Sequence, residues 1–160
     1  MAGSCHGGSH TGVYQFIKEN KFIPFDTCMP YIACSSESKE GFCSHVDTTC
    51  TAMNTCRTCS TFTESGGTCT ALDLFPNATV AEYGEIFHPV PEERVRMIKK
   101  EIHARGPVSA SINAKPLDNF MGGMIFDDDN AMQNPDHVVS IVGWGNENGK
   151  EYWLIRNSWG

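Results

Sequence analysis

The sequence predicts an α+β protein in two parts that differ in composition. Residues 78–160 combine one helical pattern with several β-branched runs and contain no cysteine. Residues 1–77 hold all eight cysteines, are rich in Ser, Thr and Gly, and show little periodicity beyond residue 27. We therefore expect two parts, a cysteine-rich one over 1–77 and a regular α+β one over 78–160.

The helix of the second part is predicted from Pro91 to Arg105. Proline followed by two glutamates suits a helix N-terminus, and apolar residues then recur at helical spacing. Gly106-Pro107 follows the last basic residues and ends the helix.

Three strands follow this helix. Val108–Ile112 alternates apolar and small polar residues, and His137–Gly145 is a β-branched run typical of a buried strand. Glu151–Arg156 is a third strand, and the turn sequence Asn146–Lys150 (NENGK) joins it to the second one. These two strands are therefore predicted to form a hairpin.

The first part offers fewer signals. Gly12–Asn20 predicts a short helix, because Val13, Phe16 and Ile17 share one helical face. The stretch 27–70 is long for a loop, so we expect disulfide bonds to keep it compact.

Composition excludes several classes of function. The chain has 160 residues, a net charge of −7 and a globular share of apolar residues. Its acidic balance argues against nucleic-acid binding, which needs clustered Lys and Arg. No apolar run approaches the roughly 20 residues of a membrane span.

Dense cysteines and the glycosylation sequon at Asn77 predict a lysosomal or extracellular protein. The first eight residues lack the basic start and apolar core of a signal peptide. We therefore interpret the chain as a fragment of a longer exported protein.

The segment from residue 136 onward carries the candidate chemistry. A hairpin can bring His137, at the start of one strand, beside Asn157, just past the end of its partner. The Asn carboxamide would fix the imidazole tautomer and leave the other ring nitrogen free to take a proton. The Trp159 indole would shield the pair from water. The alternative is a core histidine bonded to a backbone carbonyl, beside an Asn that caps a turn.

His137–Gly145 and Glu151–Gly160 resemble the histidine and asparagine signatures of papain-family cysteine peptidases. Arg105–Ser109 resembles the Gly-Pro turn of that family, and Gly122–Phe126 resembles its Gly-Gly-Ile-Tyr element. The N-terminal segments are most similar to one carboxypeptidase branch of the family: Ala2–Gly8, the helix after it, Asp26-Thr27-Cys28 and Cys56-x-x-Cys59.

The resemblance implies an incomplete two-lobed papain fold with a helical, disulfide-bonded lobe and a β-barrel-like lobe. It implies peptide-bond hydrolysis, with His137 as the base, Asn157 as the orienting residue and Trp159 as the shield. Gly7 and Gly8 would pair with the substrate backbone. The implied partners are peptide or protein substrates and a protein inhibitor, and no cofactor or metal is implied.

The chain departs from the family at the nucleophile, because it has no Cys-Gly-Ser-Cys-Trp segment with an upstream Gln. Cys5 lies 132 residues before His137, within the roughly 130–150 typical of this family. However, His6-Gly7-Gly8 is a poor helix start and matches the substrate loop better. We therefore interpret Cys5 as structural, and we expect these 160 residues to be inactive by themselves.

All eight cysteines are disulfide candidates by resemblance, although their connectivity cannot be deduced from the sequence. They are Cys5, Cys28, Cys34, Cys43, Cys50, Cys56, Cys59 and Cys69. A zinc site among the last four is an alternative. Two other functions also remain open: a non-catalytic pseudo-peptidase that binds peptides or inhibitors, and a cysteine-rich structural protein.

Overall fold

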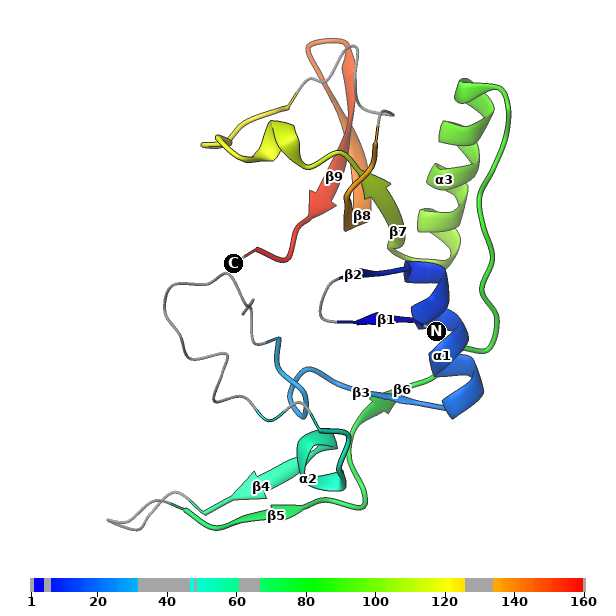
Figure 1. Ribbon diagram of the computed structural model, residues 1–160. Helices are drawn as coiled ribbons and strands as arrows, with labels where there is room; N and C mark the ends of the chain where they lie inside the picture. Colours follow the sequence, from blue (N-terminus) through cyan, green and yellow to red (C-terminus); the bar gives the residue numbers. More distant parts are fainter. Residues whose placement is uncertain are drawn as a thin grey trace. The chain divides into compact units, whose positions relative to one another are not determined.

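The computed structural model describes residues 2–4, 7–31, 47, 49–60, 67–125 and 134–159. The chain forms two compact units, Met1–Gly84 and Glu85–Gly160. Both contain helices and strands, so the predicted α+β class is confirmed (Figure 1). No helix in the described residues combines the length and the apolar character that crossing a membrane requires.

The second unit is built around a three-stranded antiparallel sheet in the order β7-β8-β9. Its strands are β7 (Val108–Ile112), β8 (His137–Glu147) and β9 (Lys150–Arg156). In the described part of the chain β7 and β9 are the edges of an open sheet, so the expected barrel-like lobe is not a closed barrel.

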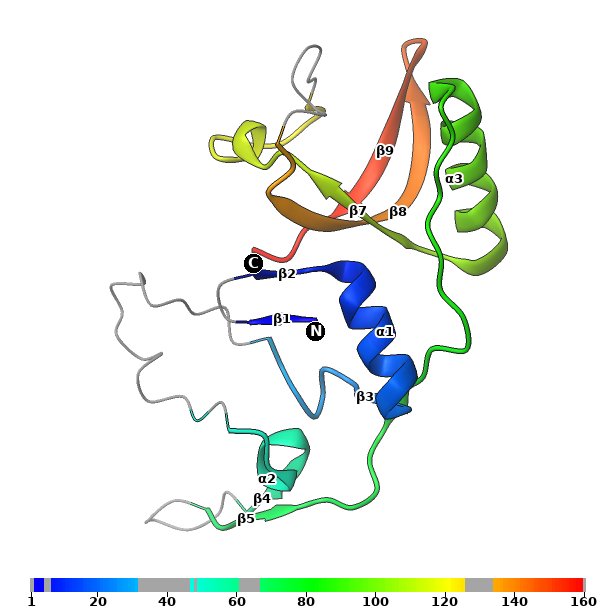
Figure 2. The same cartoon turned by 45° about the vertical axis from the view of Figure 1, so that its right-hand side comes forward.

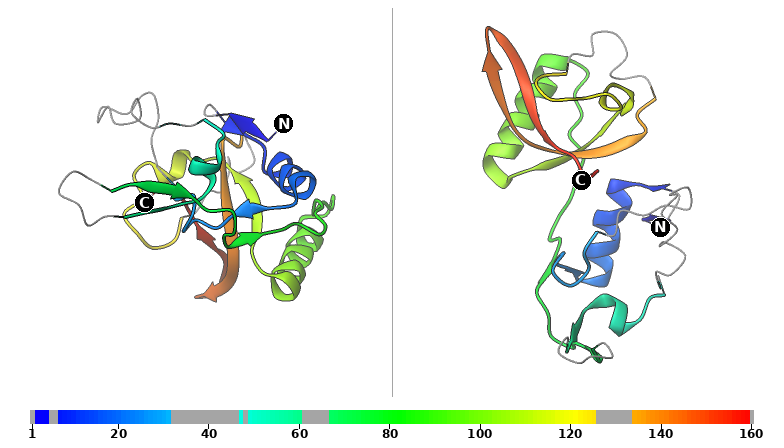
Figure 3. Two further views of the ribbon diagram at one scale, coloured as in Figure 1. Left: turned by 90° about the horizontal axis from the view of Figure 1, so that it is seen from below. Right: turned by 90° about the vertical axis from the view of Figure 1, so that its left-hand side faces the viewer.

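Helix α3 (Pro91–Arg105) has the predicted bounds. Pro91 occupies its first turn with two glutamates, and Gly106, at φ 94°, ends it in a conformation that glycine adopts without strain. The helix packs on β7 and β8, as Figures 2 and 3 show from several sides. Ile102 of the helix and Val139 and Ile141 of β8 are buried and form the core of this unit.

The hairpin between β8 and β9 turns on two residues, Asn148 and Gly149, whose φ values are 53° and 81°. Two consecutive positive φ values define the tight turn whose twist matches that of paired strands. The predicted five-residue turn is therefore wrong, because pairing continues to Glu147 and Lys150. The Asn146 side chain supports the turn by accepting a hydrogen bond from the Gly149 N–H (3.1 Å).

In the first unit, helix α1 (His10–Asn20) begins two residues before the predicted start. The reason is Ser9, whose Oγ accepts a hydrogen bond from the Gly12 N–H at 3.4 Å and caps the helix. Ile17 is the buried residue of α1.

The other elements of this unit are short. Helix α2 spans Ala52–Thr55. Three antiparallel pairs join β1 (Gly3–Ser4) to β2 (Gly7–Gly8), β3 (Ile23–Pro24) to β6 (Asn77–Ala78), and β4 (Arg57–Cys59) to β5 (Cys69–Ala71).

Disulfide bonds Cys28–Cys56 and Cys59–Cys69 crosslink the segment that was expected to need them. The prediction that Cys50 is in a disulfide bond is wrong, because it carries a free, exposed thiol just before α2. Three of the four proposed zinc ligands, Cys56, Cys59 and Cys69, are disulfide-bonded, so the alternative of a zinc site among these four cysteines is wrong. Cys5, Cys34 and Cys43 lie outside the described residues.

Candidate active site

The register of the β8–β9 hairpin places the candidate residues on one face of the sheet. His137 opens β8, and alternate residues Val139 and Ile141 share its face. Ile141 lies opposite Ile155 on β9, so Asn157, two residues further, is on that same face. Alternation in a regular ladder thus brings an imidazole and a carboxamide from the ends of the two strands together.

The imidazole and the carboxamide make a direct hydrogen bond, with His137 Nε2 2.7 Å from Asn157 Oδ1. The same oxygen accepts a hydrogen bond from the backbone N–H of Ser158 (2.8 Å). A backbone N–H can only donate, so the shared atom is the carbonyl oxygen and not the amide nitrogen. Nε2 must therefore carry the proton, which leaves the lone pair of the neutral ring on Nδ1.

Trp159 lies beside this pair, with its ring 5.0 Å from the His137 ring and tilted by 38°. His137 is half-buried, whereas the Trp159 side chain remains 50% exposed. The indole therefore covers the imidazole in part and does not enclose it. The alternative of a core histidine bonded to a backbone carbonyl is wrong, since its partner is a side chain.

Gly7 and Gly8 form the exposed strand β2 of the first unit. Gly8 is opposite Gly3, and a Cβ on Gly8 would lie 2.5 Å from the Ala2 carbonyl oxygen, so this hairpin itself requires glycine. The Ser9 N–H donates a hydrogen bond to the Ala2 carbonyl oxygen (2.9 Å), so Ala2 and Ser9 form a hydrogen-bonded pair. Hydrogen-bonded and non-bonded pairs alternate along an antiparallel ladder, so the neighbouring pair of Gly3 and Gly8 is non-bonded. The N–H and C=O of Gly8 consequently point away from β1.

Tyr152 was not anticipated as part of the hairpin's packing. It lies directly opposite Gly145, and a Cβ at Gly145 would clash with its ring. The ring therefore covers the bare backbone of the glycine. A glycine opposite an aromatic residue across a predicted hairpin is a signal that could have indicated this contact.

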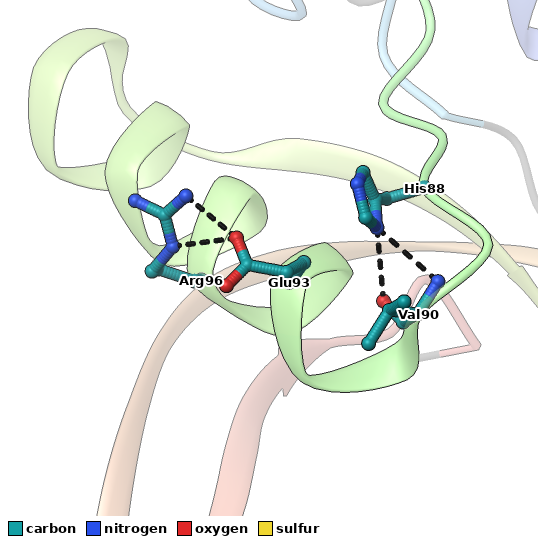
Figure 4. Close-up of polar contacts among 4 residues, drawn as sticks. All are labelled: His88, Val90, Glu93 and Arg96. Atoms are coloured by element: carbon teal, nitrogen blue, oxygen red, sulfur yellow. Dashed lines mark hydrogen bonds and ion pairs between the residues drawn. The ribbon is translucent and has the colours of Figure 1, made fainter.

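His88 has a hydrogen-bond partner in the segment that leads into α3. Its Nδ1 accepts a hydrogen bond from the Val90 N–H (3.2 Å) just before α3 (Figure 4). One turn into the helix, Arg96 donates two hydrogen bonds to Glu93. These bonds and the positive charge of Arg96 hold the pKa of the Glu93 carboxyl below its ordinary value.

In the described ranges no three His, Cys, Asp or Glu residues gather as metal ligands would.

The structure thus shows an α+β chain in which an asparagine side chain holds a histidine at the end of an antiparallel hairpin. A comparison with protein families matches residues 1–160 to the papain family cysteine proteases. The chain belongs to this family.

Curated relatives agree. The chain is 32% identical to cathepsin Z of Onchocerca volvulus over 99% of its own length and 44% of that protein. It is 28% identical to cathepsin S of Bos taurus over 98% of its length and 37% of that protein. It therefore spans less than half the length of these relatives. Cathepsin Z, also called cathepsin X, is the branch that the N-terminal segments resemble.

Proposed function

We propose that the protein to which these residues belong hydrolyses peptide bonds with a cysteine thiolate, for which His137 is the base. The observation that supports this is the 2.7 Å bond from His137 Nε2 to Asn157 Oδ1. It fixes the tautomer in which Nδ1 can take a proton from a thiol.

In the proposed reaction, Nδ1 of His137 removes the thiol proton, and the thiolate adds to the peptide carbonyl carbon. The imidazolium then gives this proton to the leaving amine as the C–N bond breaks, and an acyl-enzyme remains. Water, deprotonated by the same imidazole, releases the acid product and restores the thiol. Asn157 keeps the ring in one plane through both steps, while Trp159 limits the access of water to their hydrogen bond.

The proposed substrates are peptides or proteins in a lysosomal or extracellular setting. The outward N–H and C=O of Gly8 suit pairing with an extended peptide backbone. Carboxypeptidase action is proposed from the similarity to cathepsin Z. Asn77 is exposed on β6, as a glycosylation acceptor must be.

The isolated 160 residues are proposed to be inactive, because no cysteine stands in the family's nucleophile motif. The test is turnover of a fluorogenic peptide by the purified chain. No turnover is expected. Turnover that His137→Ala abolishes would contradict the proposed inactivity.

A chimera tests the proposed roles directly. The matching segment of the Onchocerca volvulus cathepsin Z is replaced by this chain, and peptide turnover is measured. His137→Ala is expected to lower kcat about 10²–10⁴-fold, and Asn157→Ala about 10–100-fold. The matched control is His103→Ala, an exposed histidine of α3, which should leave turnover unchanged. Equal activity of the His137→Ala and His103→Ala chimeras would refute the proposal.

The alternative is a pseudo-peptidase that binds peptides without cleaving them. The free backbone edge at Gly8, in a chain without the nucleophile motif, favours this alternative. Saturable binding of an extended peptide to the 160 residues, with the peptide recovered intact, would support it.

A further inference from the structure

The N–H of Val90, the capping residue of α3, is bound by a histidine. Helices often begin with a capping box, in which a glutamate at the third helical position accepts the N–H of the capping residue. Glu93 holds that position in α3, but its Oε2 accepts two hydrogen bonds from the guanidinium of Arg96 (2.6 and 2.8 Å). The Val90 N–H donates to Nδ1 of His88 at 3.2 Å, so the imidazole takes the place of the capping carboxylate (Figure 4).

This hydrogen bond exists in only one protonation state of His88. Nδ1 accepts the Val90 N–H through its lone pair, so the neutral ring carries its proton on Nε2. A second proton would occupy Nδ1 and turn this acceptor into a donor. An acceptor for that donor is at hand, because the Val90 carbonyl oxygen lies 3.4 Å from Nδ1. The N–H and the C=O of one residue therefore suit the two states of the ring.

The segment before α3 has a second attachment that does not depend on the protonation of the ring. Arg94 donates from Nε (3.0 Å) and from Nη2 (2.8 Å) to the carbonyl oxygen of His88. A guanidinium stays charged throughout the pH range in which histidine titrates. Protonation of the imidazole would therefore release the Val90 N–H and leave the segment attached to the helix.

We propose that His88 is a proton-responsive cap of α3. The neutral ring holds the Val90 N–H, and the protonated ring releases it and donates to the Val90 carbonyl oxygen. Histidine is the side chain that ordinarily changes its charge between about pH 5 and pH 8, which is the range of this switch. The exchange of partners is a local event at the start of the helix, and it does not depend on the proposed function.

Charged groups of α3 act on the ring in both directions. The Glu93 carboxylate senses the charge of His88 and attracts an imidazolium, although Arg96 and Lys100 act on the same carboxylate. Arg94, at the His88 carbonyl oxygen, and the positive end of the helix dipole repel it. Because both signs of charge lie near the ring, the two states are best distinguished by the hydrogen bond to Val90, and the test follows that bond.

The test uses NMR of the isotope-labelled 160-residue chain, with the His88 ring shifts reporting its protonation. While the ring is neutral, a scalar coupling across the hydrogen bond should join the Val90 nitrogen to His88 Nδ1. On protonation this coupling should vanish, and the Val90 carbonyl ¹³C signal should shift with the same midpoint. Protection of the Val90 amide, relative to its intrinsic exchange rate, should fall about fivefold, as expected for one neutral hydrogen bond. The Arg94 Nε–H should keep its protection in both states.

Three substitutions separate capping from the effect of a nearby charge. His88→Asn keeps an acceptor two bonds beyond Cβ, where Nδ1 stands, and cannot titrate, so the Val90 amide should stay protected at every pH. His88→Ala removes the acceptor and should leave that amide unprotected even at high pH. The matched control is His103→Asn, at an exposed histidine of α3, which should not change the Val90 transition.

Three results would overturn the proposal. The first is the absence of the coupling while the ring is neutral. The second is a Val90 amide and carbonyl that do not respond as the His88 ring is protonated. The third is a Val90 transition that persists in His88→Asn, because another group would then cause it. These readouts need no catalysis, so failure here leaves the peptidase proposal standing, and an inactive chimera leaves this one standing.

Discussion

The two units of the chain are stabilised in different ways. In Met1–Gly84 each strand pair is only two or three residues long, and disulfide bonds and helix caps supply the constraints. In Glu85–Gly160 a three-stranded ladder of longer strands, whose register shifts once between Ile141 and Gly143, packs against α3. The candidate base lies in the second unit, where backbone pairing fixes positions without covalent help. The comparison predicts that each unit will respond to a different kind of substitution.

The largest expected effect is the loss of the Cys28–Cys56 disulfide in Cys56→Ser. The bond closes a loop with a sequence separation of 28, and opening it should cost about 3.5 kcal/mol by loop entropy. The buried position of Cys56 adds the cost of a buried hydroxyl. Hydrogen exchange should increase at Ile17 and remain unchanged at Val139.

Cys50→Ser is the matched control, because Cys50 is free and exposed. It should leave exchange in both units unchanged. Equal acceleration at Ile17 and Val139 in Cys56→Ser would mean that the two units unfold together.

Ile141→Ala should produce the reverse pattern at a slightly smaller cost. Ile141 is buried at the centre of the sheet, opposite both Val108 and Ile155, so its truncation should cost about 3 kcal/mol. Exchange should increase at Val139 and not at Ile17. Val138→Ala, on the exposed side of the same strand, should cost less than half as much. A larger effect at Val138 would contradict the assignment of the buried face.

Gly149→Ala tests the hairpin turn alone. Gly149 has φ 81°, where a Cβ costs about 1–2 kcal/mol. Its Cβ would meet no other atom, so the cost should come from the backbone and not from a clash. Thermal unfolding of the second unit should occur at a lower temperature. The control is Gly84→Ala, also in open space but without a positive φ, and an equal loss there would exclude the backbone explanation.

The second unit was the more predictable one, because its signals are local. Pro91 and Gly106 mark both ends of α3, and the alternation over Val108–Ile112 predicts the bounds that β7 has in the structure. The turn between β8 and β9 was predicted too long, because polar residues there continue the ladder. The short strands of the first unit have no periodicity that a sequence could reveal, since partners far along the chain define them.

The candidate site was predictable to the same extent. The meeting of His137 and Asn157 follows from the hairpin, which local sequence predicts. The hydrogen bond from the Ala114 N–H to the side chain of Asp136, the residue directly before His137, was missed because the donor is 22 residues away and is only a backbone N–H. No residue type marks such a donor. The positions of Gly7 and Gly8 were noted for substrate pairing, but their packing against β1 could be seen only in the structure.

The smallest expected effect is on the acid response of α3. Hydrogen bonds from Arg96 and its charge hold the pKa of Glu93 below the ordinary glutamate value of 4.5. A depressed pKa in the folded state adds stability above the unfolded value, and this is lost as the pH falls through the folded pKa. The helix should therefore lose stability below about pH 4.5, and Glu93→Gln should flatten that loss. Both groups are largely exposed, so the change should be small and should weaken in salt.

In the first unit, Asp47 supplies the comparison for this titration. Its pKa is lowered by hydrogen bonds from Thr49, without a cation among the causes. The acid response that depends on Asp47 should therefore persist in high salt, whereas that of Glu93 should shrink. Amide exchange at Thr49 and at Arg96, measured from pH 6 to about pH 3 at two salt concentrations, separates the two cases. Equal salt dependence at both sites would show that charge pairing is not what distinguishes the carboxylate on α3.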